Sequence, residues 1–319
     1  MKKKWLFLSI CLLGISVLSY FGLTKFRREE HPRKLQHVKA QQASYFDPVS
    51  ITKFTAADQP CLPIQMNEKT ITIKLDLGFR GDFGFKREFL AEIPEKKYLG
   101  LGEKYGFRGN VYKEKLYEGP KITIGNMVFS QGTLEEEAEQ FSKDSFIGKE
   151  GQEPSPDEIG RVGWELFRIV NLFLDLKNSK IAFCDSLATL GQQGYSIETF
   201  VKTPLLSNRG FVEFDAMTPS GLLRCSLDTG STWNILNTEL EAGKTIEQMA
   251  WDPNNVSKFL EFKIEGVNFG EMAFHRIPVN IPIHDDATLG MEFFKEHLVF
   301  LDFYEGQIYI APAPSDPQM

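Results

Sequence analysis

The sequence predicts an all-β protein made of two barrel-like lobes that follow an N-terminal transmembrane helix. Short strand-like runs separated by Gly-containing turns fill the chain from about residue 60 onward. One segment of the first half occurs again in the second half, and nineteen residues near the N-terminus carry no charge. Many short strands with few long helical patterns are typical of β-sandwiches and β-barrels.

The N-terminal segment, residues 1–24, is predicted to be a signal anchor. Three lysines precede the uncharged run from Trp5 to Leu23, which is long enough to span the hydrocarbon core of a bilayer. We expect a single-pass membrane protein whose globular part is exported, on the periplasmic or another extracytoplasmic side. Cleavage of the segment as a signal peptide, which would release a secreted protein, is the alternative. Residues 25–45 are polar and are predicted to be a linker.

Composition narrows the function classes. With 42% hydrophobic and 25% charged residues the chain is globular, and its 319 residues suit about two domains. A net charge of −7 without a basic stripe argues against nucleic acid as a partner. Beyond the anchor only Cys61, Cys184 and Cys225 occur, at spacings that suit no metal site. We expect either three buried thiols or a single disulfide, and no metal.

An internal repeat indicates a duplicated architecture. Residues 162–183 align without a gap to residues 289–310, and seven of the 22 positions are identical. Gly163 matches Gly290 in this alignment. Asp175 and Asp302 also match, but they follow the short helix in the closing hairpin, where we expect them to have a turn or salt-bridge role.

Each copy of the repeat is preceded by an apolar run that ends in an aspartate. In the second half, Leu222–Leu227 leads into Asp228-Thr229-Gly230-Ser231. In the first half, Ile71–Leu75 leads into Asp76-Leu77-Gly78-Phe79. The first loop therefore has the aspartate and the glycine but neither of the two hydroxyl residues.

These loops, with the repeated apolar-apolar-Gly element behind them, resemble the catalytic loops of the aspartic protease family, both pepsin-like and retropepsin-like. The resemblance covers about residues 60–312; it is strong in the second half and degenerate in the first. It implies two pseudo-twofold-related acid-protease lobes. The expected boundaries are an N-terminal lobe at 46–190 with a solvated surface insertion at 134–158, a crossover at 191–205 and a C-terminal lobe at 206–313.

The resemblance also implies roles for single residues. Asp228 and Asp76 match the catalytic pair, which would share one proton and activate a water molecule. Thr229 matches the residue that hydrogen-bonds to the opposite loop, and Ser231 matches the hydroxyl that supports the aspartate. The remaining supports of the catalytic loops are glycines: Gly230, Gly78, Gly290 and Gly163.

A further hairpin is a candidate for the mobile flap that covers the cleft in this family. Phe107 and Gly109 lie about thirty residues after Asp76, in the region where the family places its flap. The adjacent residues His284, Asp285 and Asp286 cannot all point one way, so we do not expect a metal site there.

The function expected from this resemblance is hydrolysis of peptide bonds, with a peptide or protein as substrate and no cofactor. A catalytically inactive peptide-binding or assembly module is the alternative, because the first loop lacks its hydroxyls. We expect a monomer; a homodimer that pairs two second lobes is the other arrangement.

Overall fold

The computed structural model describes residues 35–36, 45–55, 58–105, 110–130, 132–137, 159–207, 210–250, 256–278 and 286–314. The described residues belong to one compact unit, Leu35–Met319, and most of them are in strands. The predicted all-β class is confirmed. The predicted anchor, residues 1–24, lies outside the described residues; among the described ones, no helix is long and apolar enough to cross a bilayer.

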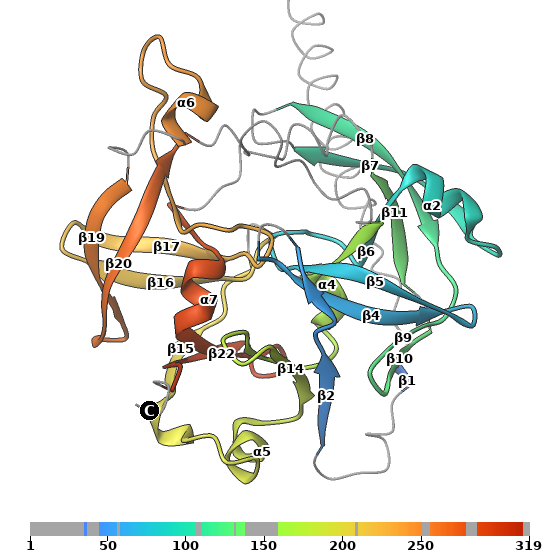
Figure 1. Ribbon diagram of the computed structural model, residues 1–319, viewed down its shortest axis with the longest axis horizontal. Coiled ribbons are helices and arrows are strands. Elements are labelled where there is room, and N and C mark those ends of the chain that lie inside the picture. The colour runs from blue at the N-terminus through green and yellow to red at the C-terminus, as the bar shows by residue number, and fades with distance from the viewer. Residues whose placement is uncertain are drawn as a thin grey trace, which may run out of the picture. The chain divides into compact units, whose positions relative to one another are not determined.

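Strands of the first half form an eleven-stranded sheet, coloured blue to green in Figure 1. Its main path runs in the order β1-β10-β9-β4-β5-β12-β6-β11-β8-β7, with β3 paired to β4. The strands are β1 (Leu35–Gln36), β3 (Lys53–Phe54), β4 (Pro60–Met66), β5 (Lys69–Asp76), β6 (Phe83–Lys86), β7 (Lys97–Tyr105), β8 (Val111–Glu118), β9 (Ile122–Ile124), β10 (Met127–Phe129), β11 (Thr133–Glu137) and β12 (Gly160–Gly163), and the helix α2 (Arg87–Glu92) follows β6.

The β4–β5 hairpin shows how local chemistry delivers Asp76. Its two turn residues, Asn67 and Glu68, have positive φ angles of 47° and 66°. Positive φ at both central residues is typical of the two-residue type I′ turn, whose twist matches that of the two strands it joins. Along β5 the apolar residues Ile73 and Leu75 are buried, and their burial fixes the register of the strand. Asp76 is the last residue of β5.

Six strands of the second half form a closed barrel, coloured yellow to red in Figure 1. Closure leaves no unpaired strand edge, which limits aggregation. The barrel order is β16-β17-β21-β18-β20-β19. Its elements are β16 (Glu213–Thr218), β17 (Gly221–Leu227), β18 (Ile235–Asn237), β19 (Val256–Ile264), β20 (Val267–Ile277) and β21 (Ala287–Leu289), with the helices α6 (Ile246–Ala250) and α7 (Met291–Glu296).

A six-stranded sheet contains strands from both halves, in the order β15-β23-β22-β13-β14-β2. Its elements are β2 (Phe46–Ser50), β13 (Leu172–Asp175), β14 (Lys180–Cys184), β15 (Val201–Pro204), β22 (His297–Asp302) and β23 (Gln307–Pro312), and three short helices accompany them, α4 (Trp164–Phe167), α5 (Leu187–Gln192) and η2 (Ile197–Thr199). The two central strands, β13 and β22, are the aligned copies of the repeat.

These central strands pair symmetrically. Phe173 and Phe300, which match each other in the sequence alignment, are also direct antiparallel partners. The hairpin partners β14 and β23 flank them on either side. The sequence repeat therefore has a counterpart in the hydrogen-bonding pattern, with a local two-fold relation between β13 and β22.

Several smaller predictions can be compared with the structure. Cys61, Cys184 and Cys225 are buried thiols, as in the first of the two alternatives. Asp175 and Asp302 accept backbone N–H groups of Asn178 and Glu305, so their turn role is confirmed. The predicted crossover, residues 191–205, includes η2 and the sheet strand β15.

The surface insertion predicted at 134–158 is wrong at its start. Residues 134–137 belong to β11, which pairs with β6 and β8, and Leu134, Glu135 and Glu136 are buried. Burial is accommodated because Glu135 pairs with Lys104 and Glu136 with Arg87. The sequence predicts a solvated run of glutamates because the cations that neutralise it, on α2 and β7, lie elsewhere in the chain. Residues 138–158 lie outside the described part of the chain.

Candidate functional site: a pair of aspartates

The second aspartate loop begins where β17 ends. The backbone N–H of Asp228 donates to the carbonyl of Leu289 on the neighbouring strand β21 (3.0 Å), and Ser231 N–H closes the turn onto the Asp228 carbonyl (3.2 Å). Within the turn, the N–H of Gly230 donates to Asp228 Oδ1 at 2.7 Å. The backbone therefore holds the Asp228 carboxylate by a direct hydrogen bond.

The first aspartate loop, at the end of β5, has the same turn as the second loop. The N–H of Phe79 donates to the Asp76 carbonyl (3.0 Å), which is the counterpart of the Ser231 bond. The strand β12 runs parallel to β5 and places Gly163 beside Asp76. Strand β21 runs parallel to β17 in the same way. Both loops are thus supported by an equivalent parallel strand.

Gly163 and Gly290, which lie behind the two loops, leave no room for a side chain. A Cβ on Gly163 would lie 2.3 Å from the Phe79 carbonyl oxygen, and one on Gly290 would lie 2.2 Å from that of Trp233. Immediately after these glycines, Trp164 N–H donates to the Phe79 carbonyl (3.3 Å) and Met291 N–H to the Ser231 carbonyl (2.8 Å). The expected support of both loops by Gly163 and Gly290 is therefore seen in the structure.

The two carboxylates lie against the opposite loops. A Cβ on Gly78 would be 2.4 Å from Asp228 Cγ, and a Cβ on Gly230 would be 2.4 Å from Asp76 Oδ1. Each glycine thus leaves room for the aspartate of the other half. Asp76 and Asp228 are close enough to share a hydrogen bond. The structure therefore brings together Asp76 and Asp228, the two residues predicted to form the pair.

Thr229 links the two loops. Its buried hydroxyl donates to the carbonyl of Leu75 (2.8 Å) and accepts the backbone N–H of Leu77 (3.0 Å). This is the cross-loop bond expected of Thr229. Leu77 has no hydroxyl with which to return it, and its side chain is instead fully buried in the apolar core.

Ser231 does not support Asp228 in the way the resemblance implies. Its hydroxyl donates to the carbonyl of Trp233 at 2.8 Å. The carboxylate has the Gly230 N–H instead. The expectation fails because a serine in a tight turn can bond to a nearby backbone carbonyl as readily as to a side chain.

The environments of the two aspartates drive their pKa values apart. Burial, and after it the nearby negative charge of Asp76, raise the pKa of Asp228 to about 7. Burial alone would raise the pKa of Asp76 too, but the positive charges of Lys74 and Arg161 lower it below its usual value. The pair therefore holds one proton at mildly acidic pH, with Asp76 ionised and Asp228 protonated.

Two cations beside Asp76 were missed by the sequence reading. Arg161 Nη1 lies 3.1 Å from Asp76 Oδ2, and Lys74 Nζ lies 3.9 Å from the same oxygen. Lys74 stands two residues before Asp76 on a strand, so the alternation of side chains could have placed it on the same face. Arg161 stands two residues before Gly163, but no spacing rule links it to Asp76.

Gln59 also reaches the site from outside the aspartate loops. Its side-chain amide donates to the carbonyl of Gly230. The flap candidates Phe107 and Gly109 lie outside the described residues, although β7 and β8, which pair antiparallel on either side of them, are described.

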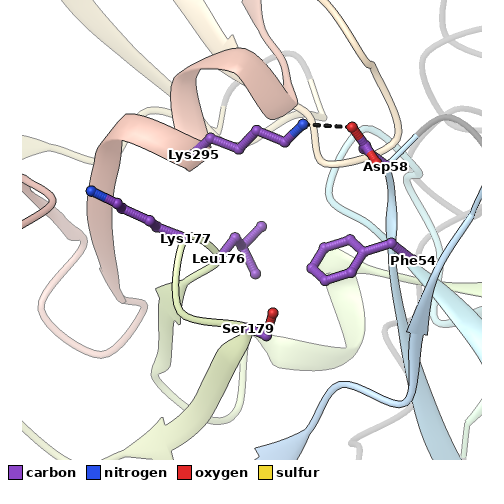
Figure 2. Close-up of a pocket in the computed structure, with 6 residues that line it drawn as sticks. All are labelled: Phe54, Asp58, Leu176, Lys177, Ser179 and Lys295. Atoms are coloured by element: carbon purple, nitrogen blue, oxygen red, sulfur yellow. Dashed lines mark hydrogen bonds and ion pairs between the residues drawn. The ribbon is translucent and has the colours of Figure 1, made fainter. Parts of the chain in front are cut away.

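A separate hollow of about 390 Å³ shares no residue with the aspartate pair. Figure 2 shows Phe54 and Leu176 at this hollow, with Lys295 and Asp58 joined across it by an ion pair of 2.6 Å. Both charged side chains of that pair are about half exposed, so the pair contributes little stability.

Within the described ranges, no cluster of three or more His, Cys, Asp or Glu side chains is arranged to hold a metal ion. His284 and Asp285 lie outside those ranges, and Asp286 accepts the backbone N–H of Arg224 at 3.0 Å.

Fold and site together define a mostly β protein in which two strand-end aspartates, one from each half of the chain, meet as a pair. No protein-family model matches the sequence, and no curated protein matches it either.

Proposed function

We propose that this chain is an aspartic-type peptide hydrolase whose catalytic pair is Asp76 and Asp228. The observation that carries the proposal is the close approach of the two carboxylates, each of which lies against the glycine of the opposite loop. Two carboxylates this close cannot both ionise easily, so they share a proton. That is the arrangement needed to activate water without a metal ion or a covalent intermediate.

In this mechanism the ionised Asp76 accepts a proton from a water molecule, whose oxygen attacks the carbonyl carbon of the peptide bond. The protonated Asp228 donates its proton to the carbonyl oxygen, and a tetrahedral diol forms. Asp76 then donates the proton that it took from water to the nitrogen of the scissile bond, and Asp228 takes back a proton from a hydroxyl of the diol. The C–N bond breaks, an acid and an amine leave, and the pair again holds one proton on Asp228. No cofactor takes part.

The duplicated architecture supports the same proposal. We propose two lobes of the acid-protease type, related by a two-fold axis that passes between β13 and β22. The symmetric pairing of Phe173 with Phe300 and the matched turns of the two loops support this arrangement. Because both aspartates come from one chain, we propose a monomeric enzyme, with an extended peptide as substrate. Anchoring to a membrane through residues 1–24 remains a prediction.

The direct test is cleavage of a peptide library by the full-length protein between pH 3 and 8. We expect cleavage in mildly acidic solution, and its loss in Asp76→Asn and in Asp228→Asn. Asp58→Asn is the matched control, because Asp58 is exposed and pairs with Lys295 instead of touching the site. If no peptide is cut at any pH, or if either site variant cleaves as well as the wild type, the hydrolase proposal is wrong.

One observation favours a second candidate, an inactive peptide-binding module. Asp76 is ion-paired to Arg161, and its loop lacks both hydroxyls. A binding module would retain peptides without cutting them. Retention measured by fluorescence polarisation, unchanged in Asp228→Asn and without cleavage products, would support this alternative.

A further inference from the structure

Phe79 of the first loop stands where the second loop has the much smaller Ser231, and two cations lie over its ring. Phe79 is buried, with 4% of its surface exposed. Lys104 Nζ lies 3.5 Å from the ring centroid, and the guanidinium carbon of Arg161 lies 4.6 Å from it. Both distances fall within the range of a cation–π attraction. The aromatic side chain thus takes the place of a hydroxyl and contacts a guanidinium group.

The guanidinium group of Arg161 also hydrogen-bonds to the Asp76 carboxylate, which the hydrocarbon ring of Phe79 cannot do. Arg161 donates from Nη1 to Asp76 Oδ2 at 3.1 Å and from Nε to Glu137 Oε1. Its side chain is only 14% exposed. Gly84 makes room for Glu137, because a Cβ there would lie 2.4 Å from Glu137 Oε1. Carboxylates on two strands and an aromatic ring therefore fix the orientation of this arginine.

The second half of the chain has no such arginine at the corresponding place. Arg161 aligns with Thr288 in the repeat, and the Thr288 hydroxyl bonds to that of Ser226 at 3.3 Å. Asp228 is bonded by the Gly230 N–H instead. The arginine therefore belongs to the half that lost its hydroxyl residues.

We propose that Arg161 is a positioning residue that gives Asp76 a side-chain hydrogen bond that its own loop does not provide, keeping this carboxylate oriented and ionised so that the shared proton of the pair resides on Asp228. The inference rests on the proposed hydrolase function for its catalytic meaning. The effect of Arg161 on the titration of the aspartate pair can be measured without catalysis. It gives Asp76 the part of base and Asp228 the part of acid, where a symmetric pair would leave the two parts interchangeable.

The charged groups around the pair come from several elements. Asp76 faces Lys74 on its own strand, Arg161 on β12 and Asp228 from the other half. Arg161 also faces Glu137 on β11. Lys104 on β7, which shares the Phe79 ring, pairs with Glu135 and Glu114. Both Lys74 and Arg161 lower the pKa of Asp76 by their charge, and Arg161, the nearer of the two, also donates a hydrogen bond to its carboxylate. Removal of Arg161 therefore takes away a charge and a hydrogen bond together.

The test is a titration of the full-length protein carrying ¹³C-labelled aspartate carboxyl groups, followed by NMR. In the wild type we expect one step of the pair below the usual aspartate range and one near pH 7. In Arg161→Gln the lower step should rise by about one pH unit or more, because an opposite charge at this distance lowers a carboxyl pKa by about 1–3 units. Arg161→Lys should restore part of the shift.

Arg87→Gln is the matched control, because Arg87 pairs with the neighbouring Glu136 on the same strand as Glu137 and is mostly exposed. We expect it to leave both steps unchanged. If Arg161→Gln fails to fold because Glu137 loses its partner, the double variant Arg161→Gln/Glu137→Gln removes both charges. A folded variant whose lower step stays at the wild-type position would overturn the proposal.

Cleavage assays separate the two proposals. Loss of Arg161 should move the acid limb of the cleavage profile to higher pH and lower the rate about 10–100-fold at the wild-type optimum. If the titration behaves as expected but the wild type cuts no peptide, the role of Arg161 stands and the hydrolase proposal fails. If the wild type cuts peptides and both the titration and the acid limb are unchanged in Arg161→Gln, the hydrolase proposal stands and the role of Arg161 fails.

Discussion

At the first loop a partly buried arginine of β12, Arg161, contacts the aspartate, whereas in the second loop a backbone N–H does. The two loops share their turn bonds, their parallel supporting strand and the glycine behind them. They differ at the two positions after the aspartate where the second loop carries hydroxyls, Leu77 and Phe79 against Thr229 and Ser231. The backbone frame is therefore duplicated, and the support of the carboxylates is not.

This difference means that the two carboxylates are contacted by groups of different kinds. The hydroxyl of Thr229 accepts the N–H of Leu77 and donates to the carbonyl of Leu75, so this one hydroxyl makes two hydrogen bonds to the first half of the chain. The first loop has no hydroxyl at Leu77 or Phe79, and the guanidinium group of Arg161 contacts Asp76. The consequence is an asymmetric pair, in which the pKa of Asp76 is lowered and that of Asp228 is raised.

The largest effect should come from the glycines that let the aspartates meet. In Gly78→Ala or Gly230→Ala the new methyl group would collide with the carboxylate of the opposite half. We expect cleavage to fall by about 10²–10³-fold, because catalytic groups displaced by about 1 Å lose rate on this scale. Overpacking should also lower the free energy of unfolding by about 2–3 kcal/mol. Steady-state kinetics and urea unfolding would measure the two effects.

Gly191→Ala is the control for this pair of variants. Gly191 lies in α5, and its nearest neighbours are side-chain atoms of Ile197 at 3.2 Å or more, which can shift. We expect a change below about 1 kcal/mol in unfolding free energy and unchanged cleavage. Equal tolerance of alanine at 78, 191 and 230 would contradict the close approach of the two carboxylates.

The next effect concerns the single hydroxyl that links the loops. Thr229→Val keeps the shape of the side chain but leaves the Leu77 N–H and the Leu75 carbonyl without this partner in a buried place. We expect a loss of about 2–3 kcal/mol in unfolding free energy. Thr229→Ser, which keeps the hydroxyl, should lose less. A cost for Thr229→Val no larger than for Thr229→Ser would mean that methyl packing, and not the hydrogen bonds, holds the loops together.

How far the sequence predicts this molecule depends on whether the signal is local. Alternation along β5 and β17 and the turn residues between strands predict the β class. The meeting of Asp76 with Asp228 is expected only from the resemblance of the two loops to those of aspartic proteases. The contact of Arg161 with Asp76 could not be predicted, because the two residues are 85 positions apart in the chain. The burial of Glu135 and Glu136 escaped for the same reason, since it depends on Lys104 and Arg87.

A third prediction concerns pH and uses the raised pKa of Asp228. A group whose pKa is higher in the folded state stabilises the fold fully at pH values below its unfolded pKa, near 4, and loses this stabilisation as pH rises through the folded value of about 7. Asp228→Asn removes that dependence. From pH 5 to pH 8 we expect the unfolding free energy of the variant to gain about 2–3 kcal/mol relative to the wild type.

Chemical denaturation at several pH values would measure this gain. Asp286→Asn, which alters an exposed aspartate of the same half, should track the wild type across the whole range. A constant difference between Asp228→Asn and the wild type would show that Asp228 titrates in the folded state as it does in the unfolded chain. The pair would then not share a proton in this pH range.

The smallest effect should come from Ser231, the hydroxyl that the resemblance assigns to Asp228. Because this hydroxyl donates to the Trp233 carbonyl, Ser231→Ala should cost about 0.5–1.5 kcal/mol of unfolding free energy and change cleavage less than about threefold. Kinetics at fixed pH beside urea unfolding would separate the two quantities. A loss of cleavage above tenfold with an unchanged unfolding free energy would mean that the hydroxyl supports the carboxylate during the reaction. The second loop would then need its own side-chain support, and the contrast with the arginine-supported first loop would lie only in the kind of group that provides it.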